Sequence, residues 1–265
     1  MTDALVVVAT VALDARDEAV LAGLQALARR IPLARVELLH VGDAAAEERV
    51  RVLADRLRSE CATQVNGRVL DGRVDRAADA VLDELHADLL VVGRSESGPH
   101  SGWGEHGLAL LRAAERPVLV IPEGATVAFS TAFVGMDLSD AAFTAMDWAE
   151  RLCERVVAVA VVAQEDLLVD SAAALADLET NYDVARTARG RRPSDLRVTT
   201  GSPADALLAL APECDLLAVG SRGLTPLAAA VLGSTAERLG GRAPCAVLVV
   251  RPAAGKGLLG ALFGT

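Results

Sequence analysis

The segment Ala87-Asp-Leu-Leu-Val-Val-Gly93 returns later in the chain as Cys214-Asp-Leu-Leu-Ala-Val-Gly220, and this repeat decides the fold. Each copy is apolar on both faces and ends in glycine, which is typical of a parallel strand covered by helices on both sides. The next apolar run repeats as well: Arg116-Pro-Val-Leu-Val-Ile-Pro122 corresponds to Cys245-Ala-Val-Leu-Val-Val-Arg251. Because the offset is about half the chain, we interpret the sequence as two copies of one domain, not as a solenoid.

We expect the domains to span residues 1–124 and 130–252, with a tail over 253–265. Both copies alternate β-rich runs with stretches of helical period. Strands are expected near residues 4–9, 35–41, 65–70, 88–92, 117–121, 131–136, 156–162, 195–199, 214–219 and 246–250. Helices are expected near residues 14–30, 45–60, 74–86, 105–114, 140–153, 165–190, 203–211 and 233–241. This alternation predicts an α/β fold with two tandem, doubly wound, parallel five-stranded sheets.

The composition excludes several classes of function. With 26 basic and 36 acidic residues the net charge is −10, which repels nucleic acids and anionic membranes. The only lysine is Lys256, so a Walker phosphate loop, a Schiff-base enzyme and a kinase-type phosphate lysine are all excluded. The four cysteines form no C-x-x-C pair, and the apolar stretch near the start is too short to span a bilayer. We therefore predict a cytoplasmic protein with reduced thiols.

A glycine-rich loop in the second half carries the strongest functional signal. The strand ending at Val219 is followed by Gly220-Ser-Arg-Gly223. After nine intervening residues, Gly233-Ser-Thr235 begins a helix. Gly220 and Gly223 can take positive φ and let a ligand approach the backbone. Free N–H groups at the helix start favour a phosphate, and Arg222 supplies a positive charge without a lysine.

This G-x-x-G-x9-G-S spacing resembles the ATP-binding branch of the universal stress protein family. Val134-Gly-Met-Asp-Leu-Ser139 and Arg242–Val250 look like that family's first and last strands, so the resemblance covers nearly the whole chain as a tandem two-domain member. It implies that Asp137 meets the adenine or ribose end of ATP and that Val161 packs against adenine. It further implies phosphate-side contacts from Val219, Gly220, Arg222, Gly223, Gly233, Ser234 and Thr235.

Plainer explanations stay open for single residues. Glycines after strands are often only turns, Ser234 could be only a helix N-cap, and Asp137 could cap the helix expected near Asp140. The cysteines Cys214 and Cys245 are expected to be core thiols.

The first half departs from the pattern. Gly93 stands opposite Gly220 and Gly104 opposite Gly233, but Glu96, Glu105 and His106 replace Gly223, Ser234 and Thr235. Its first strand ends at Ala9-Thr10 without an aspartate. Because a carboxylate there occupies the position of a phosphate, we predict that the first half does not bind ATP in the usual way. A metal or another small ligand near His100 and His106 stays open, and His40 is expected to be structural.

The resemblance implies a stress-related, ATP-binding regulatory protein, with or without Mg²⁺, that acts on an unknown protein partner. We assign no catalytic or metal-ligating residue, so whether the chain is an enzyme stays open, and any ATPase activity is expected to be slow. The alternative is an interaction module without nucleotide, whose halves pair through their last strands, residues 118–121 and 247–250. An enzyme of the related adenine nucleotide hydrolase group is the third alternative. A homodimer and the role of the apolar tail also stay open.

Overall fold

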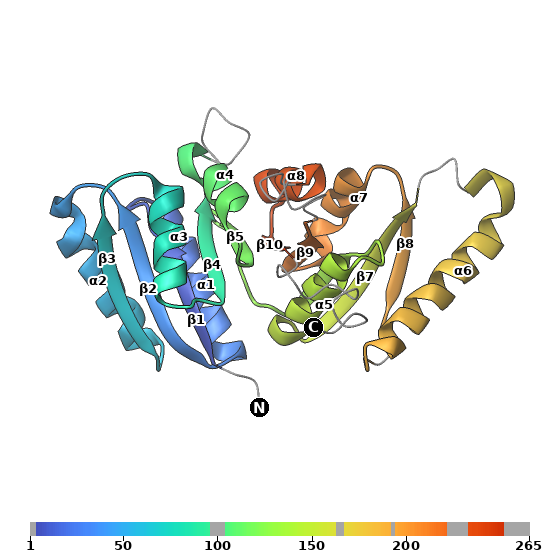
Figure 1. Cartoon of the computed structure of the whole chain (residues 1–265), viewed down its shortest axis with the longest axis horizontal. Coiled ribbons are helices and arrows are strands. Elements are labelled where there is room, and N and C mark those ends of the chain that lie inside the picture. The colour runs from blue at the N-terminus through green and yellow to red at the C-terminus, as the bar shows by residue number, and fades with distance from the viewer. Residues whose placement is uncertain (1–3, 96–103, 163–166, 192–193, 222–232, 252–265) are drawn as a thin grey trace, which may run out of the picture.

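All the strands and helices predicted from the sequence are present, within a few residues of the expected bounds, in the computed structural model of the protein (Figure 1). The structure describes residues 4–95, 104–162, 167–191, 194–221 and 233–251. The first half consists of β1 (Leu5–Thr10), α1 (Arg16–Arg30), β2 (Leu33–Val41), α2 (Glu47–Glu60), β3 (Gln64–Leu70), α3 (Val74–Glu84), β4 (Leu89–Arg94), α4 (Gly104–Ala113) and β5 (Val118–Pro122). The second half consists of β6 (Thr131–Gly135), α5 (Asp140–Leu152), β7 (Arg155–Val162), α6 (Leu167–Ala188), β8 (Leu196–Thr200), α7 (Pro203–Leu210), β9 (Leu216–Gly220), α8 (Ser234–Arg242) and β10 (Ala246–Val250).

The strands form one ten-stranded sheet in the order β3-β2-β1-β4-β5-β10-β9-β6-β7-β8. Each half contributes five parallel strands in doubly wound order, which confirms the predicted fold class. The two sheets are joined because β5 and β10 pair antiparallel, with Val120 opposite Val247 and Val118 opposite Val249. The expected pairing of the last strands is therefore confirmed, and it makes the two predicted sheets continuous.

Helices cover both faces of this sheet. One apolar cluster lies between the sheet and α1, α2 and α5, with Tyr182 of α6 at its edge. The other lies between the sheet and α3, α4, α7 and α8. Because both clusters contain residues of both halves, the two domains share their core, and its side chains are mainly aliphatic.

Two arginines fasten the halves to each other beyond the strand pair. Arg94, at the end of β4, donates to the carbonyls of Gly241 at 2.6 Å and Ala243 at 2.7 Å, at the end of α8. Arg251, after β10, donates to two carbonyls at the end of α4, at 2.8 and 3.1 Å. Cations at helix C-termini satisfy carbonyls that have no partner within the helix and oppose the helix dipole. Each half thus caps a helix of the other.

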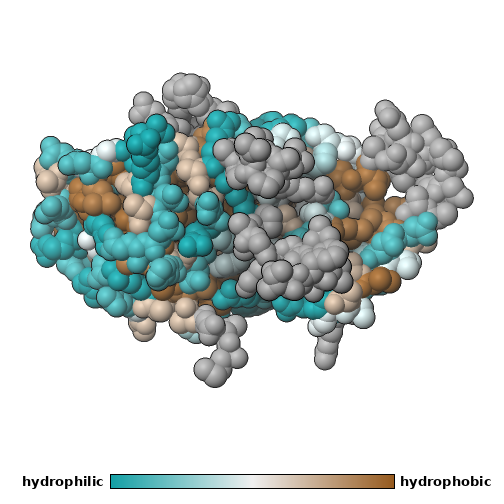
Figure 2. Space-filling model, viewed as in Figure 1, coloured by the Kyte–Doolittle hydropathy of each residue, from teal (hydrophilic) through white to brown (hydrophobic). Residues whose placement is uncertain are grey.

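The surface is mixed in polarity. Figure 2 shows hydrophilic residues over much of the first half, and hydrophobic residues near α7 and β8. Within the described ranges, every helix is too short or too polar to cross a lipid bilayer.

Candidate functional site

The switch of strand order in the second half lies between β6 and β9, which are neighbours in the sheet. Ligands of doubly wound sheets bind beyond the carboxyl ends of the strands at this switch. Gly135 pairs with Val219 on one side and with Val159 on the other. Asp137 and Val161 therefore lie two residues beyond this row and Gly220 lies one beyond it, so the sheet brings these predicted residues to one edge.

The loop after β6 holds Asp137 at this edge. Its Oδ1 accepts hydrogen bonds from the backbone N–H of Ser139 at 3.0 Å and from the Ser139 hydroxyl at 2.5 Å. Ser139 is the N-cap of α5, since its Oγ accepts from the N–H of Ala142 at 3.2 Å. The alternative that Asp137 itself caps this helix is therefore wrong: it orients the capping serine, and its own side chain is exposed.

The backbone between these two residues is strained. Leu138 has φ of 60°, and Leu13 has φ of 62° in the corresponding loop of the first half. Left-handed backbone is uncommon for a residue with a Cβ and is found mainly where the surrounding structure enforces it. The two halves therefore share the loop geometry, although only the second carries the aspartate.

Gly220 ends β9 directly beneath α5. A Cβ on this residue would lie 2.6 Å from both the carbonyl oxygen of Ala141 and the backbone nitrogen of Ala142. Its φ is not positive, so Gly220 does not use the left-handed backbone that glycine permits. The glycine is required because the first turn of α5 approaches the strand too closely for any side chain.

No side chain among the described residues caps the start of α8. Gly233 is its N-cap, with φ of −64° and ψ of 139°. Of the described atoms, a Cβ at Gly233 would contact the hydroxyl of Ser221, at 3.9 Å. Ser234 is exposed and Thr235 half-buried in the first helical turn. The first N–H groups of α8 form a partly positive helix end, which favours an anion.

Ser221 links β9 to this helix, and the sequence reasoning missed it. It is 2% exposed, its N–H donates to the carbonyl of Val250 at 2.8 Å, and its hydroxyl accepts from the N–H of Gly233 at 3.4 Å. The signal was its place between Gly220 and Arg222. Arg222 and Gly223 lie outside the described residues.

Carboxylates of the first half occupy the edge of the sheet that corresponds to the candidate site. Ala12 stands at the position of Asp137, because the paired strands β1 and β4 match β6 and β9 residue for residue. Asp17, which is 4% exposed, accepts from the N–H groups of Ala12 and Leu13, both at 2.8 Å. Beside it, Asp14 pairs with Arg16. A phosphate at this edge would meet two carboxylates.

The pKa values of these carboxyls shift in opposite directions. Burial raises the pKa of Asp17, against the lowering effect of its two backbone hydrogen bonds. The side-chain hydrogen bond from Arg16 lowers the pKa of Asp14.

The opposite shifts predict opposite pH dependences of stability. A carboxyl whose pKa is raised in the folded protein contributes stability at pH values below its unfolded pKa of ~3.9. This contribution to the free energy of unfolding is lost as the pH rises through the folded-state pKa. We therefore expect the free energy of unfolding of the wild type, minus that of Asp17→Asn, to fall as the pH rises from about 4. For Asp14→Asn the same difference should fall as the pH drops below about 4. Urea unfolding across this range measures both, and the same sign for both variants would contradict the assignment.

Other predicted features of the first half are only partly described. Gly104 begins α4, so Glu105 and His106 belong to its first turn as predicted. Glu96 and His100 lie outside the described residues, as does the tail. His40 contacts the carbonyl of Val11 through Nδ1 at 2.9 Å, which agrees with a structural role. The described part of the chain contains no cluster of three or more metal-ligating side chains.

Comparisons with known proteins identify the family and the fold of the chain. Residues 129–251 match the sequence model of the universal stress protein family. A universal stress protein of Mycobacterium tuberculosis is 31% identical over 141 aligned residues, which make up 46% of this chain and 97% of that relative. The structure of a universal stress protein from Archaeoglobus fulgidus has a TM-score of 0.74 at 19% identity and covers 93% of this chain and 98% of its own. A functionally unknown protein from Pseudomonas aeruginosa has a TM-score of 0.67 at 16% identity, covering 94% of this chain and 93% of its own.

Proposed function

Because the chain belongs to the universal stress protein family, we propose that its second half binds ATP, with or without Mg²⁺, and regulates a protein partner without rapid hydrolysis. The observation that carries the proposal is the start of α8, where no described side chain caps the helix and a Cβ on Gly233 would come no closer than 3.9 Å to a described atom. Phosphate is the anion that such a helix start suits best.

Residues at the carboxyl edge of β6 and β7 would hold the nucleoside. Asp137 is exposed at this edge and keeps an oriented carboxylate that can accept hydrogen bonds from ribose or adenine. Val161, half-buried near the end of β7, offers an apolar surface for the base. The phosphate end would lie against Gly220, Gly233, Ser234 and Thr235, and we assign Arg222 and Gly223 to the same loop. Val219 would contribute a backbone contact.

The second half alone is proposed to bind the nucleotide. At the corresponding edge of the first half, Asp17 takes the backbone N–H groups and Asp14 adds a second carboxylate. The Asp17 carboxylate would repel a phosphate by roughly 4 kcal/mol per charge pair at 4 Å and an effective dielectric constant of 20, whereas Arg16 offsets much of the charge of Asp14. We therefore expect one nucleotide per chain. The first half is a structural partner that shares its core with the second.

The pairing of β5 with β10 also bears on the alternative of an interaction module. Both last strands are occupied within the chain, so they offer no edge to another protein. The edges of the sheet are β3 and β8.

Two measurements test the proposal. Mass analysis of small molecules extracted from the purified protein should detect an adenine nucleotide. Titration with ATP should give one site per chain, and Asp137→Asn should weaken binding about tenfold through loss of a charged acceptor, which contributes ~1.5–3 kcal/mol. Asp14→Asn, in the first half, is the matched control and should leave the affinity unchanged. A stoichiometry of two, or equal loss in both variants, would contradict the proposal.

A further inference from the structure

The internal repeat allows the two halves to be compared position by position. Leu90 and Leu217 lie in the repeated segment and pair with Val8 and Phe133, so Val8 corresponds to Phe133. The next strands then show that Glu37, which pairs with Val8, corresponds to Val157, which pairs with Phe133.

The flanking arginines are retained in both halves. Arg35 and Arg155 lie two residues before Glu37 and Val157. Arg68 pairs with Leu39 on β2, and Arg197 pairs with Val159 at the matching place on β7. The arginines thus correspond, whereas the carboxylate between them is present only in the first half.

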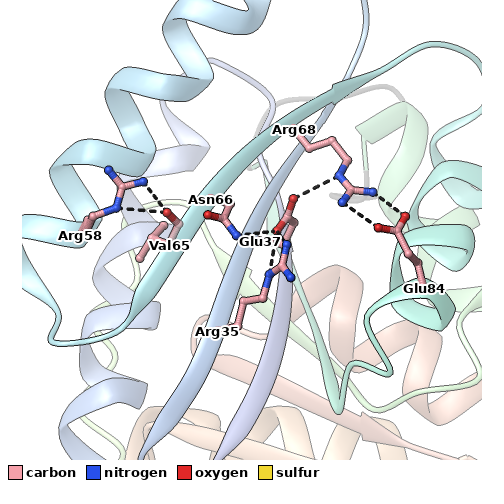
Figure 3. Close-up of polar contacts among 7 residues, drawn as sticks. All are labelled: Arg35, Glu37, Arg58, Val65, Asn66, Arg68 and Glu84. Carbon is pink, nitrogen blue, oxygen red and sulfur yellow. Dashed lines mark hydrogen bonds and ion pairs between the residues drawn. The ribbon is translucent and has the colours of Figure 1, made fainter.

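In the first half, the Glu37 carboxylate is held between two guanidinium groups (Figure 3). Its side chain is 3% exposed, with Arg35 Nη2 at 2.8 Å from Oε2 and Arg68 Nε at 3.1 Å from Oε1. Arg68 also binds Glu84 through both terminal nitrogens, at 2.6 and 2.9 Å, and Asn66 lies beside the carboxylate. Arg58 fastens α2 to this edge through the carbonyl of Val65.

In the second half, a hollow of about 310 Å³ lies where the first half has this network. Phe133, Val157 and Leu196 are its apolar lining residues. Its polar lining residues are Thr131, Arg155, Asp195, Arg197 and Glu213. A valine at the position of Glu37 removes both the carboxylate and part of the side-chain volume. The hollow is at the amino ends of β6, β7 and β8, opposite the nucleotide edge.

The two arginines are held only loosely by their present partners. Arg155 pairs with Asp195 at 3.3 Å, and both side chains are about two-thirds exposed. Arg197 pairs with Glu213 at 2.8 Å, again in solvent, while its guanidinium lies 6.0 Å from the centre of the Phe133 ring. Exposed pairs of this kind contribute little, so an incoming carboxylate can compete with them.

We propose that this hollow binds a small organic carboxylate, whose charged group lies between Arg155 and Arg197 as the Glu37 carboxylate lies between Arg35 and Arg68. Its short apolar body would rest on Phe133 and Val157. The hollow has room for a small acid such as butyrate. This site does not depend on the proposed nucleotide site.

Calorimetric or NMR titration of the full chain with butyrate tests the proposal, with uncharged butyramide as the chemical control. We expect saturable binding of butyrate and none of butyramide. Arg197→Gln should weaken butyrate binding at least about tenfold, the equivalent of one charged hydrogen bond. Arg56→Gln, which removes an equally exposed arginine far from the hollow, should leave it unchanged.

Further variants distinguish a site that binds a ligand from a hollow whose arginines are already neutralised by carboxylates of the chain. Asp195→Asn recreates the neutral Asn66 of the first half and should tighten butyrate binding several-fold. Val157→Glu should abolish binding by supplying the missing carboxylate, and Val157→Leu should also block it by filling the hollow, should the glutamate variant fail to fold. The proposal is overturned if the wild type does not bind butyrate saturably, even where Asp195→Asn does, or if filling the hollow changes nothing.

Discussion

Gly233→Asp should lose at least a hundredfold in affinity for ATP while the protein stays folded. Aspartate is a better helix N-cap than glycine, and the φ and ψ of Gly233 suit any residue, so the free energy of unfolding should stay the same or rise by a few tenths of a kcal/mol. The new carboxylate, however, would stand where a phosphate is proposed to bind. At ~4 Å and an effective dielectric constant of 20, repulsion reaches ~4 kcal/mol per charge pair, and partial exposure reduces it to roughly the 2.7 kcal/mol of a hundredfold loss.

Gly233→Asn is the matched control for this substitution. Asparagine has nearly the same shape as aspartate and is as good an N-cap, but it carries no charge. We expect it to lose far less affinity than the aspartate variant, as measured by titration with ATP, while urea unfolding verifies that both variants are folded. Equal losses in both would show that shape rather than charge decides, and unchanged binding in both would remove the nucleotide from the start of α8.

Gly220→Ala should lower the free energy of unfolding by about 3 kcal/mol, the upper end of the usual cost of overpacking. The added Cβ would lie 2.6 Å from backbone atoms of Ala141 and Ala142, which can move only if the first turn of α5 shifts away from the sheet. Urea or thermal unfolding measures the loss. Because that turn also carries the cap of Ser139, we expect the loop of Asp137 to be disturbed as well.

The chain supplies its own control at the corresponding position. A Cβ at Gly93 would meet the side chain of Val20 at 3.0 Å and the Cβ of Arg16 at 3.3 Å, so mainly side-chain atoms must yield. Gly93→Ala should therefore cost about 1 kcal/mol, the lower end of the same range. Equal costs at the two glycines would contradict the argument that the backbone of α5 makes Gly220 indispensable.

Local patterns were sufficient to predict the elements and their order. Alternating apolar runs and helical periods placed the strands and helices. The pairing of β5 with β10 was part of the interaction-module alternative, on the grounds of unpaired strand edges and the family resemblance. The position of Asp137 followed from the end of a strand. Contacts between distant segments could not be predicted in this way. The approach of α5 to Gly220 and the reach of Arg94 to the end of α8 depend on the packing angles of whole elements, which periodicity does not encode.

The site of the first half illustrates the same limit. The sequence shows that this half lacks the aspartate. Together with the acidic residues Glu96 and Glu105, this predicted that the first half does not bind ATP in the usual way. The structure adds Asp17, which lies in the first turn of α1 and accepts hydrogen bonds from the N–H groups of Ala12 and Leu13. Nothing in the spacing distinguishes this aspartate from an ordinary acidic residue in a first helical turn.

Because β5 and β10 pair within one polypeptide, the two halves that they join can have different sequences. In a dimer of identical chains built on the same join, every substitution would appear on both sides of the axis, so a change that suited one edge would be imposed on the other. Here Asp137 of the second half corresponds to Ala12 of the first, and Val157 corresponds to Glu37, so each pair of corresponding positions carries two different residues. Because the halves are fused, each can carry its own residues at corresponding positions while β5 and β10 stay paired.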